Sequence, residues 1–62
     1  MLNNYDKMKI HTIFTKYQPA LIETIYNKNE LAQMYITTFG YKPTENLRKR
    51  DIVKKISRKL KV

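Results

Sequence analysis

Basic side chains are the residues of this chain best suited to bind a ligand, and most of them lie in its last third. Residues 42–62 hold nine Lys or Arg and two acidic residues, a net charge of +7, whereas residues 1–41 hold four and three, a net charge of +1. Nearly all of the formal charge of +8 therefore lies in one region. Positive charge gathered in this way is typical of a surface that binds a polyanion such as nucleic acid.

The first basic cluster, Arg48, Lys49 and Arg50, precedes the apolar residues of a predicted last helix. The free N–H groups and partial positive charge of a helix start favour phosphate, so we expect this cluster to be the centre of a nucleic-acid site. The other predicted contacts are Lys42, Lys54, Lys55, Arg58 and Tyr41. Tyr41 follows the predicted third helix and could stack on an unpaired base. The alternative is a lysine-rich helix face that is merely solvated.

Catalytic and metal-binding patterns are absent from the sequence. The chain has no cysteine and one histidine, so it offers neither a thiolate metal site nor a disulfide. It has no nucleophile–base pair and no glycine-rich phosphate loop. We therefore expect no enzyme activity, no cofactor, no metal and no small-molecule substrate.

The first segment, residues 5–17, has two interpretations. Apolar residues recur at i, i+3, i+4 and i+7, the spacing of one helix face: Ile10, Ile13, Phe14 and Tyr17. Asn3 or Asn4 could cap such a helix, with Asp6 near its start. The many β-branched and aromatic residues would also suit a strand. We favour the helix because no hairpin turn follows.

Pro19 is predicted to begin a second helix, since proline is favoured in the first helical turn. The residues expected to face the core are Leu21, Ile22, Ile25 and Tyr26, with Glu23 in solvent. A single kinked helix over residues 5–26 is the alternative.

A third helix is predicted with both ends marked. Asn27 and Glu30 have the spacing of a capping box, and Gly40 can adopt the left-handed conformation that ends a helix, with Pro43 beyond it. The predicted buried face consists of Leu31, Met34, Tyr35, Thr38 and Phe39.

An extended loop and a fourth helix should follow, because Pro43 steers the residue before it out of the helical region. Thr44 or Asn46 is the expected cap. The predicted core arc is Ile52, Val53, Ile56 and Leu60. The basic residues opposite this arc or along its edge are Arg50, Lys54, Lys55, Arg58, Lys59 and Lys61. The fold class predicted is all-α: one domain over residues 1–62, a three- or four-helix bundle ending in a helix–extended-loop–helix unit.

Residues 30–60 carry "ELA" at 30–32, Gly40, a proline-containing loop and "RKRDIVKKI" at 48–56. In these features the segment resembles the helix–extended-loop–helix family, which includes SAP-type DNA-binding modules and the N-terminal helical domain of the terminator Rho. The resemblance implies a two-helix module that binds DNA through the loop and the start of its second helix. Those positions are Lys42, Arg48, Lys49 and Arg50 here.

The function expected from these features is that of a small cytoplasmic accessory protein that binds nucleic acid, with DNA favoured over RNA, of the kind that phages or mobile elements encode. The alternative is an adaptor or inhibitor that docks an acidic protein. A chain of 62 residues builds a small core, which a protein partner or a homodimer could complete. No apolar run approaches the roughly 20 residues that span a bilayer, and no secretory signal pattern is present. The apolar arc of residues 46–62 is also narrow for a helix lying on a membrane surface.

Overall fold

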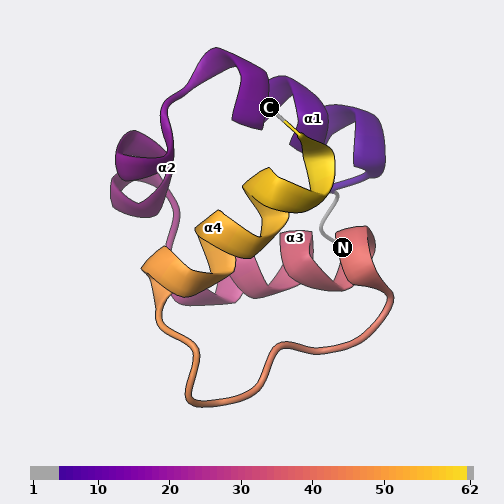
Figure 1. The fold of residues 1–62 in the computed structure, drawn as a ribbon, viewed down its shortest axis with the longest axis vertical. Coiled ribbons are helices and arrows are strands. Elements are labelled where there is room, and N and C mark those ends of the chain that lie inside the picture. The colour runs from indigo at the N-terminus through magenta and orange to yellow at the C-terminus, as the bar shows by residue number, and fades with distance from the viewer. Residues whose placement is uncertain (1–4, 62) are drawn as a thin grey trace.

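The computed structural model describes residues 5–61, and that range contains four α-helices and no strand (Figure 1). The helices are α1 (Lys7–Lys16), α2 (Pro19–Ile25), α3 (Lys28–Phe39) and α4 (Lys49–Leu60). The predicted all-α bundle is therefore confirmed, with four helices. Within the described residues, no helix is long and apolar enough to cross a bilayer.

The start of α1 is fixed by Asp6. Its Oδ1 atom accepts a hydrogen bond from the backbone N–H of Lys9 at 2.7 Å, which satisfies one of the free donors of the first turn. The helix predicted for residues 5–17 is confirmed over Lys7–Lys16, and the strand alternative is wrong. The other expected caps, Asn3 and Asn4, lie outside the described residues.

A break in the chain separates α1 from α2. Tyr17 and Gln18 are both extended, with ψ angles of 148° and 152°, and Pro19 occupies the first turn of α2. The single kinked helix is thus wrong. The cause is local, because proline forces the residue before it into extended conformations and has no N–H to continue the hydrogen-bond ladder.

Both predicted ends of α3 are confirmed. Asn27 Oδ1 accepts from the N–H of Glu30 at 2.9 Å, and Glu30 Oε1 accepts from the N–H of Asn27 at 3.0 Å. At the other end, Gly40 has φ 87° and its N–H donates to the carbonyl of Ile36 at 2.7 Å. This left-handed conformation strains any residue with a Cβ atom, and so favours glycine.

The start of α4 differs from the prediction. Neither Thr44 nor Asn46 caps the helix; the carbonyl of Thr44 instead accepts from the N–H of Leu47 at 3.1 Å, in a separate turn. Arg48 is the N-cap residue, and Asp51 Oδ2 accepts from its N–H at 3.2 Å. The helix begins later because this turn uses the residues that were expected to cap it.

The loop between α3 and α4 runs back along α3 (Figure 1). Its return is marked by Lys28, at the start of α3, whose Nζ donates to the carbonyl of Glu45 at 3.4 Å. Consequently α4 starts near the first turn of α3, and its last turn lies near α1, where Lys59 and Leu60 line a pocket with Lys7. The helix–extended-loop–helix order predicted for the second half of the chain is present.

The core lies where α4 packs against α3 and α2, with α1 closing it. The buried residues come from all four helices: Ile10, Ile13, Phe14, Ile22, Leu31, Met34, Tyr35, Ile52, Val53 and Ile56. Tyr17, Tyr26, Phe39 and Leu60 are partly buried against them, as predicted.

Two residues of α2 were wrongly placed in the core. Leu21 is 46% exposed and Ile25 is 48% exposed, while Ile22 is fully buried. The reason is the length of α2, because a helix of seven residues presents about two turns to its neighbours. Ile22 is the residue of α2 that packs into the core, and Leu21 and Ile25 lie at the edge of this contact.

Candidate nucleic-acid interface

The exposed face of α4 carries most of the predicted site. Ile52, Val53 and Ile56 are fully buried, so the helix is fixed in rotation, and the opposite side faces solvent. The exposed basic residues of this face and its edge are Arg50, Lys54, Lys55, Arg58, Lys59 and Lys61. No acidic residue occurs in residues 52–61, so the charges on the second half of the helix are uncompensated within their own segment.

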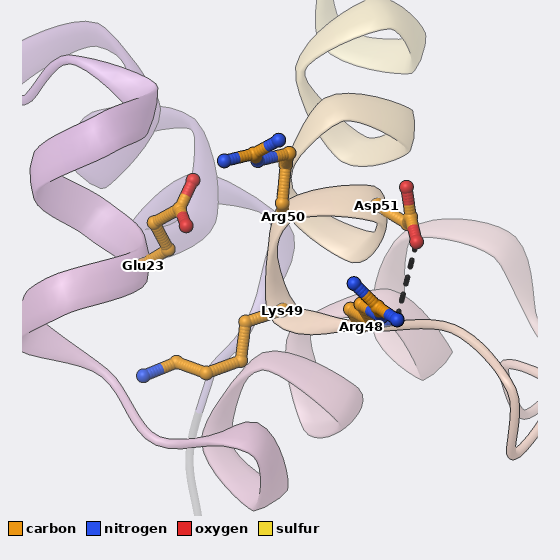
Figure 2. A pocket seen from close by; sticks show the side chains of 5 residues that line it. All are labelled: Glu23, Arg48, Lys49, Arg50 and Asp51. Carbon is orange, nitrogen blue, oxygen red and sulfur yellow. Dashed lines mark hydrogen bonds between the residues drawn. The ribbon is translucent and has the colours of Figure 1, made fainter.

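The start of α4 forms a hollow of about 470 Å³ against α2, shown in Figure 2. Its lining consists of Glu23, Arg48, Lys49, Arg50 and Asp51. Arg48 and Arg50 are exposed and Lys49 is half-buried, so the structure does bring the three residues of the first basic cluster together.

Two carboxylates share this hollow with the three basic side chains. Asp51 binds the N–H of Arg48, which occupies one of the donors that a phosphate at the helix start would use. Glu23 projects from α2, and Figure 2 shows the Arg50 guanidinium extending toward its side. The hollow is therefore less positive than the second half of α4.

Sequence reasoning missed Glu23. It assigned this residue to a solvated face of the second helix, whereas Glu23 is half-buried beside α4. Only the packing of α2 on α4 places it in the same hollow as Arg50, and no local pattern in the sequence predicts that packing. The spacing of charged residues along a helix predicts which of them are neighbours on that helix, but not which charges of another helix lie beside them.

Tyr41 lies away from this hollow, in an aromatic cluster at the end of α3. Its ring centroid is 5.7 Å from that of Tyr35 and 5.9 Å from that of Phe39, and the residue is 58% exposed. The neighbouring Tyr41 hydroxyl, followed by burial, raises the pKa of Tyr35 above its usual value. Tyr41 is thus held from one side and open on the other.

Lys42 lines a second depression, between the outer face of α3 and the loop. This groove has a volume of about 310 Å³ and an apolar floor that includes Ala32, Ile36 and Pro43. Lys28 and Lys42 stand among its polar lining residues. The predicted site residues therefore fall into three places: the hollow at the start of α4, the outer face of α4, and the loop with Tyr41 and Lys42.

Comparisons of this chain with protein-family models, with curated protein sequences and with solved structures give no match. Across residues 5–61, no group of three potential metal ligands comes together. The site must therefore be interpreted from its own geometry and charge.

Proposed function

We propose that the protein binds nucleic acid, with DNA favoured over RNA, through phosphate contacts on the exposed face of α4. The observation that carries this proposal is the basic stretch of the helix from Lys54 onward, where Lys54, Lys55 and Arg58 are all exposed. Their helix is anchored by three fully buried residues, so the cations are presented on a rigid element rather than on a tail. Ordered cations of this kind neutralise phosphates and release counterions.

The first basic cluster and the loop extend this surface. Arg48, Lys49 and Arg50 lie at the end of α4 that offers unpaired N–H groups, which favours phosphate. Tyr41 presents an exposed ring beside Lys42, an arrangement that suits stacking on an unpaired base. We expect affinity to depend little on base sequence, because phosphate contacts position a protein without identifying bases.

The order of α3, extended loop and α4 supports the proposed kinship with SAP-like and Rho N-terminal-like modules. Those modules place DNA contacts at the loop and the start of their second helix. By that analogy the protein would serve as a cytoplasmic accessory factor that recruits or coats nucleic acid, without chemistry of its own.

Charge removal at the α4 face tests the proposal. The variant Lys54→Gln/Arg58→Gln removes two exposed cations, so binding to labelled duplex DNA should weaken and the slope of log K against log salt should become shallower by about 2. Fluorescence polarisation at several salt concentrations measures both quantities.

The matched control is Lys9→Gln/Lys16→Gln, which makes the same change in net charge on α1. Lys9 and Lys16 are exposed and lie over the rings of Tyr5 and Tyr17 at 5.4 and 5.6 Å. This control should bind nearly as well as the wild type. Equal losses in the two variants would show that only total charge matters, and would contradict a site on α4.

The second candidate is an adaptor that docks an acidic protein, and the groove between α3 and the loop favours it. Its floor is apolar and its rim includes Lys28 and Lys42, which would complement carboxylates flanking an aliphatic side chain. Such a partner would contact a face of the molecule that α4 does not form.

Capture after nuclease treatment separates the two functions. An adaptor keeps its acidic partner when nucleic acid is digested, and Ala32→Arg, which fills the floor of the groove, should release that partner. Lys54→Gln/Arg58→Gln should leave it bound. Loss of every captured protein on nuclease treatment would contradict the adaptor function.

A further inference from the structure

Glu23 of α2 lines the hollow at the start of α4, and its position bears on how the basic surface binds phosphate. It is half-buried and lines the same hollow as Arg50, which comes from α4. In Figure 2 the Arg50 guanidinium extends toward the Glu23 side of the hollow, and the Lys49 side chain runs to the same side below Glu23. A phosphate that approached Arg50 here would meet the Glu23 carboxylate.

We infer that Glu23 competes with phosphate for Arg50, and so limits the affinity of the α4 surface for nucleic acid. The inference rests on the proposed function and names a restraint acting on the same surface. Its physical basis is that a carboxylate and a phosphate are both acceptors for one guanidinium, and two anions beside each other repel.

Asp51, the second carboxylate of the hollow, has a structural role instead. Asp51 is held by the N–H of Arg48 at 3.2 Å and so serves the start of the helix. Within residues 5–61 the Glu23 side chain makes no hydrogen bond that would give it a structural role of that kind. Replacing Glu23 with the equally shaped glutamine should therefore change charge while leaving the fold intact.

The inference divides the basic surface into two parts. Lys54, Lys55 and Arg58 lie on the exposed face of α4 outside the hollow, in a segment (residues 52–61) that contains no acidic residue. At the hollow, a phosphate bound by Arg50 would lie beside the Glu23 carboxylate, which repels it. The wild-type protein is thus expected to bind with fewer phosphate contacts than its count of exposed cations would allow.

The experiment measures binding of Glu23→Gln to labelled duplex DNA over a series of salt concentrations. Removing the competitor should tighten binding about three- to tenfold at low salt, and steepen the slope of log K against log salt by about 1, the value for one added phosphate contact. Glu45→Gln is the matched control: it removes one negative charge from the loop, and its residue lines the other groove. Its binding should stay within about twofold of the wild type, a difference that one distant, solvent-screened charge permits.

A double-mutant cycle tests whether Glu23 acts through Arg50. In an Arg50→Gln background, Glu23→Gln should no longer tighten binding, because the guanidinium for which Glu23 competes is gone. In the wild-type protein, NMR signals of the Arg50 side chain should shift less on DNA addition than those of Arg58. Equal shifts, or a gain that persists without Arg50, would overturn the inference.

The outcomes separate this inference from the proposed function. If neither the wild type nor Glu23→Gln binds DNA, the proposed function fails and the inference fails with it. If the wild type binds with the expected salt dependence and Glu23→Gln behaves like Glu45→Gln, only the inference fails.

Discussion

At the scale of single residues, the Glu30 carboxylate makes hydrogen bonds to two separate parts of the chain. Its Oε1 atom accepts from the N–H of Asn27 at 3.0 Å, and its Oε2 atom accepts from the hydroxyl of Tyr5 at 3.0 Å. One carboxylate therefore caps α3 and ties Tyr5, two residues before the start of α1, to it. The capping half was predicted from the spacing of Asn27 and Glu30, whereas the bond to Tyr5 spans 25 residues and left no sign in the sequence.

Replacing Glu30 tests this double role. Glu30→Ala should lower the free energy of unfolding by about 1–2 kcal/mol, since a helix cap and a partly buried hydrogen bond are both lost. Tyr5→Phe, which removes only the second bond, should cost less than Glu30→Ala. Urea denaturation followed by circular dichroism measures both, with Glu45→Ala as a control. An unchanged midpoint for Glu30→Ala would contradict the role.

Tyr5 and Tyr26 give the fold a sensitivity to alkali. Burial, and then the neighbouring Glu30, raises the pKa of Tyr5; burial, and then the nearby Tyr17 and Glu30, raises the pKa of Tyr26. The folded state therefore holds these phenolic protons more tightly than the unfolded state, whose pKa is near 10. Their contribution to stability is complete below pH 10 and is lost as pH rises through the higher folded-state values.

Denaturation midpoints measured from pH 8 to pH 11 should show this loss. The wild type should become less stable above about pH 10, and Tyr5→Phe/Tyr26→Phe should lose less over the same interval, because it has two fewer phenols to ionise. An equal or steeper fall in the double variant would contradict the assignment.

At the scale of elements, the predictions were right where the residues that determine a feature are close together in the sequence. The bounds of α3 follow from residues next to one another in sequence, the Asn27–Glu30 box and Gly40, and both were found. The start of α4 was missed because the turn at Thr44–Leu47 removes the expected caps. The exposure of Leu21 and Ile25, and the approach of Glu23 to α4, depend on how α2 packs, which periodicity does not encode.

Gly40 gives a direct test of the end of α3. Gly40→Ala should destabilise the protein by about 1–2 kcal/mol, because a Cβ atom disfavours the left-handed conformation at φ 87°. No atom lies within 4 Å of the position a Cβ would take, so the cost is one of backbone conformation alone. Gly40→Asn should cost less, since asparagine tolerates this conformation better. Equal urea midpoints for Gly40→Ala and the wild type would refute the cap.

The packing of α4 is tested by a pair of conservative changes. Ile56→Val removes one methylene from a fully buried side chain and should cost about 0.5–1.5 kcal/mol. Ile25→Val makes the same change at a residue that is 48% exposed, and should alter stability by less than about 0.5 kcal/mol. Thermal and urea unfolding compare the two. A reversed order would mean that α4 does not supply the core as described.

At the scale of the whole molecule, apolar and charged residues divide between two sides of α4. One side holds Ile52, Val53 and Ile56 in a core shared with α2 and α3, and the other carries cations into solvent. The all-α class and the basic character of the last third were both predictable, because apolar periodicity and net charge can be read from the sequence without knowing how the helices pack. The presence of a carboxylate from α2 among the cations of the hollow was not predictable, because it depends on how two helices pack.

The salt dependence of DNA binding tests the central claim most directly. If about five cations of α4 neutralise phosphates, the slope of log K against log salt should be roughly −4 to −5. Affinity for labelled duplex DNA should then fall about 250- to 1,000-fold between 50 and 200 mM salt. Binding no tighter than about 100 μM at low salt, or affinity that does not change with salt, would contradict nucleic-acid binding by this face.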